Sequence, residues 1–81
     1  MRVEIYSLQR ILFEGEAQSL NCKTAIGEIT VLDTHEPLIS MLQEGPVRIM
    51  PVGGGEEQAF AIKGGFLQVS PEHAVRLLVE E

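Results

Sequence analysis

The chain has 81 residues, of which 44% are hydrophobic and 22% charged, a composition typical of one small globular domain rather than a disordered segment. It carries 12 acidic residues against 6 basic ones, and the net charge of −6 makes nucleic acids and anionic lipid poor partners. A basic protein surface is a better partner. The single cysteine, Cys22, excludes an internal disulfide, and no Cys-X-X-Cys pattern indicates zinc or redox chemistry.

The N-terminal residues 1–5 include charged side chains where a signal peptide would need an apolar run. No apolar stretch approaches the roughly 18 residues of a membrane-spanning helix. We therefore expect a protein of a reducing compartment, either cytosolic or attached to the cytosolic side of a larger assembly, with no direct membrane insertion.

The first third of the chain predicts short strands. Val3 and Ile5 alternate with polar neighbours, which is typical of a half-buried strand, and the apolar run 10–13 predicts a second one. Residues 14–16, Glu-Gly-Glu, predict a turn. Residues 17–22 alternate again, with Leu20 and Cys22 on one face and Ala17, Ser19 and Asn21 on the other, and predict a third strand.

Residues 25–28 predict a turn because Gly27 adopts a positive φ at little cost. Strands are expected at 29–32 and 38–42. Residues 44–46, Glu-Gly-Pro, break the chain before the alternating run 47–50. No window has a convincing helical period, since Pro37 and Ile39 oppose a helix in the best candidate, residues 36–43.

Glycine and proline mark the turns of the last third. Gly53-Gly54-Gly55 predicts a hairpin tip between residues 50–52 and 58–62, Gly64-Gly65 a tight turn into 66–69, and residues 70–72 a turn into 74–79. Turn signals about 8–12 residues apart favour an all-β sandwich. We expect residues 1–81 to form one small β-sandwich of two sheets, with about ten short, mainly antiparallel strands.

Catalytic and metal sites have weak support. Cys22, His35 and Asp33 are the residue types of a nucleophile, its base and an orienting group. Cys22 lies in the middle of a patterned strand, so a buried structural cysteine is the favoured interpretation. Neither His35 nor His73 has other metal ligands at short spacing, and the three-glycine loop lacks the Gly-Lys-Ser/Thr ending of a phosphate-binding loop.

Residues 33–37, Asp-Thr-His-Glu-Pro, form the one polar corner between two apolar strands. The residues alone favour a structural turn that Asp33 or Thr34 caps and Pro37 ends. A surface shown to a partner is the other interpretation, because loops often carry function. The sequence leaves both open.

Several fragments together carry a resemblance. Leu12-Phe13-Glu14-Gly15-Glu16, then Gly27-Glu28, then His35 with Pro37-Leu38, then Gly64-Gly65-Phe66-Leu67, occur in the order and at the separations found in one family. The chain resembles the N-terminal β-sandwich of the F-type ATP synthase epsilon subunit, which is called delta in mitochondria. Asp33-Thr34 stands where that family usually has Pro-Gly, Glu36 where it has Ala, and Gln68 where it has Glu.

The resemblance implies a central-stalk rotor subunit without catalysis of its own, which links the gamma subunit to the polar loops of the c-ring and helps couple proton translocation to ATP synthesis. It would be peripheral, on the cytoplasmic face of an energy-transducing membrane. The Gly-Glu turn makes Glu28 the expected c-ring contact, and the corner makes Thr34, His35 and Pro37 further expected contacts. The acidic replacements in the corner predict a basic partner surface.

The family usually continues into two C-terminal helices, which can extend into the catalytic head to inhibit ATP hydrolysis and which bind ATP in some members. Residues up to Glu81 show no helical pattern, so we expect no inhibitory arm, no nucleotide site and no cofactor. Two alternatives remain. A free-standing sandwich that binds proteins or ligands predicts a concave face with exposed aromatics. A small hydrolase using Cys22 or His35 predicts a perturbed nucleophile in a pocket.

Overall fold

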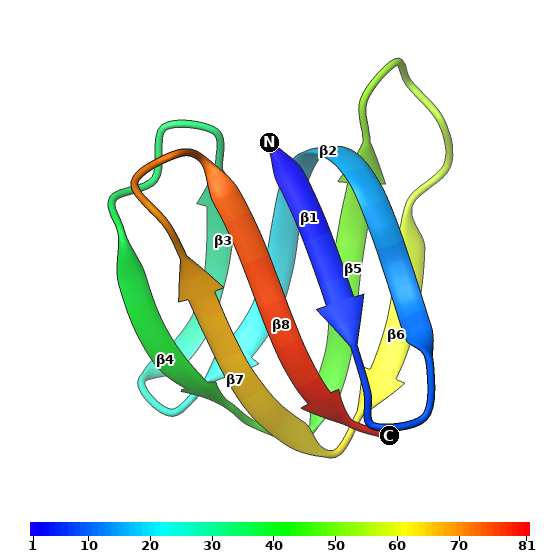
Figure 1. The fold of residues 1–81 in the computed structure, drawn as a ribbon, viewed down its shortest axis with the longest axis vertical. Coiled ribbons are helices and arrows are strands. Elements are labelled where there is room, and N and C mark those ends of the chain that lie inside the picture. The colour runs from blue at the N-terminus through cyan, green and yellow to red at the C-terminus, as the bar shows by residue number, and fades with distance from the viewer.

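The computed structural model describes all residues 1–81 as eight strands without a helix (Figure 1). The all-β expectation is therefore confirmed, with fewer and longer strands than predicted. The strands are β1 (Arg2–Tyr6), β2 (Ile11–Thr24), β3 (Gly27–Leu32), β4 (Leu38–Leu42), β5 (Gly45–Pro51), β6 (Gln58–Ile62), β7 (Gly64–Val69) and β8 (Ala74–Glu80).

The strands form two layers joined by one long strand. The first layer has the order β4–β7–β8–β1 and ends with the N-terminal half of β2, which pairs with β1 from Glu16 back to Ile11. The C-terminal half of β2 pairs with β3 and β5, and β6 completes the second layer (Figure 1). All pairings are antiparallel except β1 with β8. The result is a small β-sandwich.

A β-bulge explains how β2 serves both layers. Ala17 pairs with Pro51 and Ser19 with Met50, so Gln18 is the extra residue of the bulge. Strands that switch from one sheet to the other do so at bulges or bends. The bulge also reverses which face of β2 the side chains before it point to, relative to those after it. Ala17 is buried together with Leu20 and Cys22, although simple alternation predicted that it lies on the opposite face.

The core lies between the layers and is built from alternate residues of the strands. In β8, Val75, Leu77 and Val79 are buried while the residues between them are exposed, as a period of two requires. No buried side-chain nitrogen or oxygen lacks a hydrogen-bond partner. The buried apolar residues are Met1, Val3, Ile5, Ala17, Leu20, Cys22, Val31, Leu42, Val47, Ile49, Ile62, Leu67, Val69, Val75, Leu77 and Val79.

Two predicted turns are strands in the structure. Residues 14–16 belong to β2, where Gly15 faces Val3 of β1, so one long strand replaces the two short ones expected there. The actual turn is earlier, at residues 7–10, where the Ser7 hydroxyl accepts hydrogen bonds from the backbone N–H groups of Gln9 and Arg10. Gly64 and Gly65 likewise lie within β7 and pair with Glu80 and Val79 of β8.

Gly65 is required by packing rather than by a turn. A Cβ atom at this position would lie 2.2 Å from the carbonyl oxygen of Leu78 and 2.8 Å from Cα of Val79, and φ is +146°. No L side chain fits so close to a neighbouring backbone. The glycine thus lets β7 and β8 approach one another where the chain enters the first layer from β6.

Candidate functional site

The three residues of the hypothetical catalytic set do not form one. Cys22 is fully buried in β2, and burial raises the pKa of its thiol to about 11, which leaves almost no thiolate at neutral pH. Asp33 is exposed and pairs with the Met1 amine at 3.0 Å. His35 directs Nδ1 at the carbonyl oxygen of its neighbour Glu36, at 2.8 Å. Neither group contacts the thiol.

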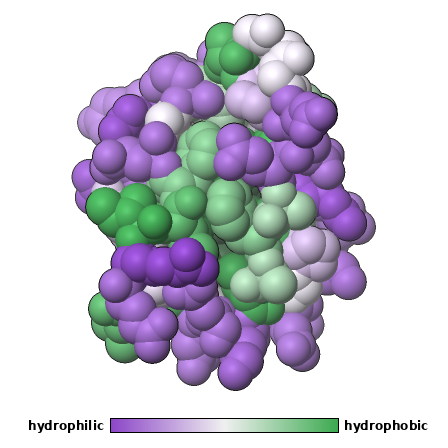
Figure 2. Space-filling model, turned by 90° about the vertical axis from the view of Figure 1, so that its right-hand side faces the viewer, coloured by the Kyte–Doolittle hydropathy of each residue, from purple (hydrophilic) through white to green (hydrophobic).

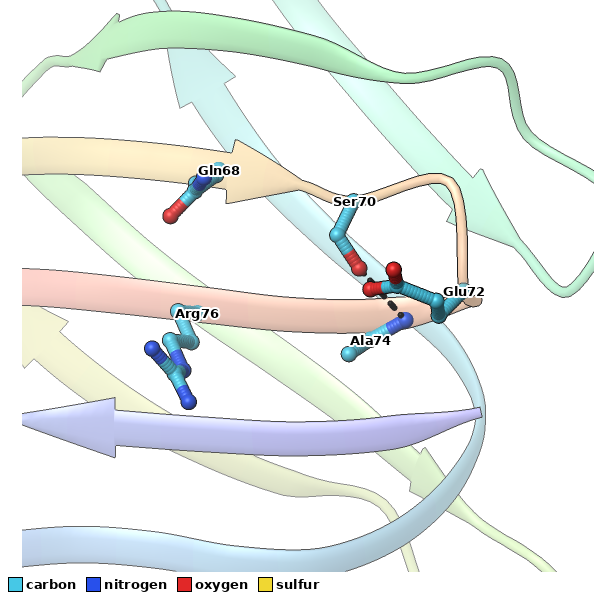
Figure 3. Close-up of a pocket in the computed structure, with 5 residues that line it drawn as sticks. All are labelled: Gln68, Ser70, Glu72, Ala74 and Arg76. Atoms are coloured by element: carbon cyan, nitrogen blue, oxygen red, sulfur yellow. Dashed lines mark hydrogen bonds between the residues drawn. The ribbon is translucent and has the colours of Figure 1, made fainter.

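The hollow at the β7–β8 turn is lined mainly by polar residues. It has a volume of about 210 Å³ and is lined by Gln68, Ser70, Glu72, Ala74 and Arg76 (Figure 3). The Ser70 hydroxyl accepts a hydrogen bond from the Ala74 N–H at 3.3 Å, and Arg76 Nε donates to Glu4 Oε1 at 3.0 Å. Such contacts build a turn and an ion pair. No histidine or cysteine lines the hollow.

The turn before β3 presents Glu28 to solvent. The buried hydroxyl of Thr24 donates to the Gly27 carbonyl at 2.8 Å and accepts from the Ile26 N–H at 3.3 Å, which fixes the turn. The Ala25 N–H donates to the Met41 carbonyl at 3.0 Å and holds the turn against β4. Ile26 is 89% exposed at its tip. The turn itself is residues 25–26, shorter than predicted, because residues 27–28 already belong to β3. We call residues 25–28, the turn with these first two strand residues, the β2–β3 turn.

The polar corner at residues 33–37 lies at the other end of β3. The His35 N–H donates to the Leu32 carbonyl at 2.9 Å and closes the corner. Thr34 is exposed and borders a polar hollow of about 480 Å³, whereas Pro37 is exposed and borders a different hollow of about 390 Å³. Figure 1 shows this corner at the top of β3 and the β2–β3 turn at the bottom.

The structure therefore divides the four predicted contact residues into two groups. Thr34, His35 and Pro37 lie together in the corner, and Glu28 lies at the opposite end of the six-residue strand β3. Lys23 is the cross-strand neighbour of Glu28 in β2. The end that carries Glu28 thus offers a carboxylate, an ammonium group and an exposed isoleucine, and the corner end offers mainly carboxylates.

Sequence reasoning did not locate a third surface, on the outer side of the first layer. Met41, Phe66 and Leu78 are adjacent across β4, β7 and β8, and each is more than half exposed. Ile39 is 76% exposed beside them and, with Phe66 and Leu78, lines an apolar hollow of about 450 Å³. These four residues are called the outer apolar face. The sequence indicates this face at residues 77–79, where three consecutive residues are apolar, so that apolar side chains lie on both faces of the strand.

None of the four aromatic residues is fully buried. Phe66 is 54% exposed in the outer apolar face, where Tyr6 lines the same hollow. Phe13 and Phe60 are half-buried and contact each other edge to face, with ring centroids 6.3 Å apart.

Glu4 lies at the border of the outer apolar face. A hydrogen bond from Tyr6 is the main cause that lowers the pKa of its carboxyl group, and the positive charges of Arg76 and Arg2 lower it further.

Residues 1–81 match the family described as the ATP synthase, Delta/Epsilon chain, beta-sandwich domain. The chain belongs to this family. Among proteins of the family it is 44% identical over 79 residues to the ATP synthase epsilon chain of Corynebacterium diphtheriae, covering 96% of this chain and 63% of that one. It is 39% identical over 69 residues to the epsilon chain of Chromohalobacter salexigens, covering 85% and 48%.

Solved structures share the delta/epsilon β-sandwich fold. One chain of the Euglena gracilis mitochondrial ATP synthase, in an assembly of OSCP, F1 and c-ring, gives a TM-score of 0.88 at 24% identity, over 98% of this chain and 49% of that one. A chain of the Tetrahymena thermophila mitochondrial ATP synthase central stalk and c-ring gives 0.83 at 17% identity, over 100% and 63%. The chain spans about half the length of the curated relatives it matches.

The structure has no helix long and apolar enough to cross a membrane. It also has no group of three or more His, Cys, Asp or Glu side chains arranged to hold a metal ion. Three surfaces stand out in the structure: the outer apolar face, the β2–β3 turn and the acidic corner.

Proposed function

We propose that this chain is a non-catalytic central-stalk subunit of an F-type ATP synthase, which links the gamma subunit to the c-ring and helps couple proton translocation to ATP synthesis. The observation that carries the proposal is the outer apolar face on a domain of the delta/epsilon family. Ile39, Met41, Phe66 and Leu78 form a contiguous exposed patch, and such patches mark protein interaction sites.

A coupling subunit needs two attachments on a stiff body. We assign the outer apolar face to the gamma subunit, since a rotor contact that persists through rotation requires an apolar centre. We assign the β2–β3 turn to the polar loops of the c-ring, where Glu28 pairs with a basic side chain and Ile26 packs beside it. The close-packed interior between these surfaces transmits torque with little deformation.

The corner residues Thr34, His35 and Pro37 form a separate proposed contact. Asp33 and Glu36 give this corner an acidic character, so it suits a basic surface of a neighbouring subunit. Because the corner lies at the end of β3 away from Glu28, it does not share the c-ring contact. In this arrangement the domain stays peripheral on the cytoplasmic face of the membrane.

The gamma contact is tested by Ile39→Asp in the full-length subunit, with binding to purified gamma subunit measured by calorimetry. Because Ile39 is 76% exposed, the domain should remain folded, while a charge placed in an apolar contact should weaken binding at least about tenfold. Val52→Asp is the matched control, since Val52 is 59% exposed in the hairpin that follows β5. Equal effects of the two substitutions, or absence of binding by the wild-type subunit, would contradict the assignment.

The c-ring contact is tested by Glu28→Lys in the reassembled ATP synthase in vesicles. We expect proton-driven ATP synthesis to fall several-fold while binding to the gamma subunit is unchanged, because one interfacial ion pair becomes a repulsive pair. Glu56→Lys, in the hairpin loop at the opposite end of the sandwich, is the control with the same change of charge. Normal coupling in the Glu28 variant would show that this carboxylate is not the contact.

A further inference from the structure

One edge of the sandwich is open to strand pairing. β6 pairs with β5 on one side, and no strand or loop pairs with its other side. Alternate residues of an edge strand direct their N–H and C=O groups away from the sheet, where they are free to bind another strand. The five residues of β6, Gln58-Ala59-Phe60-Ala61-Ile62, include no charge and no proline.

The other edge strands carry features that oppose pairing with another strand. The edge strand β3 carries Glu28, and the N-terminal half of β2 carries Glu14 and Glu16. β4 has no charge, but its backbone edge is already used at one end, where the Met41 carbonyl accepts from the Ala25 N–H and Leu42 pairs with Thr24. Charged residues and covering loops are the usual protection of exposed edges, and β6 lacks both along its length.

The open edge lies beside an apolar surface. Phe60 of β6 contacts Phe13 of β2 across the side of the sandwich, and Ile11 is 56% exposed on the same strand as Phe13. Figure 2 shows apolar side chains gathered in the middle of this side, surrounded by polar ones. An added strand would therefore gain backbone hydrogen bonds and also cover apolar side chains.

We propose that the free edge of β6 pairs with β6 of a second copy of this chain, antiparallel and centred on Phe60. In this register Gln58 faces Ile62 of the second copy, Ala59 faces Ala61, and Phe60 faces Phe60. The flanking residues then match in charge, because Glu57 precedes β6, Lys63 follows it, and each lies opposite the other across the two-fold axis. In a symmetric contact of this kind, each pair away from the two-fold axis occurs twice.

The charges within one chain leave Lys63 available for this contact. Lys63 forms no ion pair in the structure, and Glu57 has only a 3.6 Å contact with Arg48 Nε, which lies next to β6 on β5. An arbitrary partner strand would not supply a base opposite Glu57 and an acid opposite Lys63. A second copy supplies both, so the charges favour self-pairing over capture of an unrelated strand.

Association is expected to be weak, since two copies with a net charge of −6 each repel one another and the edge is short. Sedimentation equilibrium of this chain at physiological salt, from about 10 μM to about 1 mM, should show a reversible dimer with a Kd on the order of 100 μM. In NMR spectra over the same range, the amide signals that move with concentration should be those of residues 57–63 and of Ile11 to Phe13.

Charge reversal tests the register. Lys63→Glu and Glu57→Lys should each weaken dimerisation by roughly tenfold, because they replace two attractive pairs with two repulsive ones, and the double variant should restore it. Lys23→Glu is the matched control. It lies on β2, makes the same change in net charge as Lys63→Glu, and should leave the Kd unchanged within about twofold.

A chain that remains monomeric at about 1 mM would overturn the proposal, and would mean that Glu57 and Lys63 protect the edge instead. Equal weakening by Lys23→Glu, failure of the double variant to recover, or concentration-dependent shifts confined to the outer apolar face would overturn it too. Dimerisation through residues 57–63 with recovery in the double variant supports it.

Discussion

Two glycine motifs that look alike in the sequence have different roles. Gly27 lies in the open β2–β3 turn with φ at +127°, and a Cβ atom there would meet nothing within 4 Å. Gly65 lies inside the first layer with φ at +146°, and a Cβ atom there would lie 2.2 Å from a backbone oxygen of β8. Gly27 is needed because the backbone has a positive φ at an exposed turn. Gly65 is needed because a side chain there would collide with the neighbouring strand.

The difference shows that the residues that stabilise the fold and the residues proposed to bind partners lie in different regions of the molecule. The region around Gly65 belongs to the packed body, where any added atom must displace backbone. The region around Gly27 projects Ile26 and Glu28 into solvent, where side chains change without disturbing the core. Substitutions in the two regions should therefore affect different measurements, and three experiments test this.

The largest effect is expected for Gly65→Ala. The added methyl group collides with β8, and a non-glycine residue at this φ is strained, so the free energy of unfolding should fall by about 3–5 kcal/mol. Urea unfolding followed by circular dichroism measures the change. Gly15→Ala is the control, because its Cβ would make only ordinary contacts with the Phe13 ring at 3.7 Å. A loss below about 1 kcal/mol at Gly65 would show that β7 and β8 separate easily, contrary to a rigid body.

The second effect concerns alkaline pH and the buried thiol of Cys22. Its pKa is about 11 in the folded chain against an ordinary value of 9.0, so the unfolded chain loses this proton first as the pH rises. The contribution of this thiol to the free energy of unfolding is therefore fully present below pH 9. It declines between pH 9 and 11, by up to about 2 kcal/mol.

Cys22→Ser removes the thiol, and its stability should decline less steeply over the same pH range when both proteins are unfolded in urea. Identical slopes for the variant and the wild type would show that the thiol is not desolvated in the folded chain. That outcome would weaken the contrast between a packed interior and an open surface.

The smallest effect is expected for Gly27→Ala. The substitution meets no atoms and costs only the strain of a positive φ, about 1–2 kcal/mol. Thermal unfolding would measure it, and c-ring coupling would measure any displacement of Glu28. If Gly27→Ala destabilised the chain as much as Gly65→Ala, the two glycines would not differ in role.

Local patterns in the sequence correctly predicted most strands. Alternation predicted residues 74–79 and 58–62 as strands because one face of each is buried, and the polar residues 33–37 were correctly expected to separate two strands. The pattern also predicted a buried Cys22, which the structure confirms. The predictions for Glu28, Thr34, His35 and Pro37 as contacts remain predictions, now divided between two ends of the molecule.

By itself, then, the sequence determined an all-β domain of the delta/epsilon type with an acidic surface, because a period of two and turn chemistry are local properties. Only the tertiary structure decided that β2 bulges at Gln18 to join both layers, that Gly65 allows β7 to contact β8, and that the edge of β6 is free. Alternation states which side chains share a face. It does not state which strands become neighbours, because that depends on contacts between residues distant in the chain.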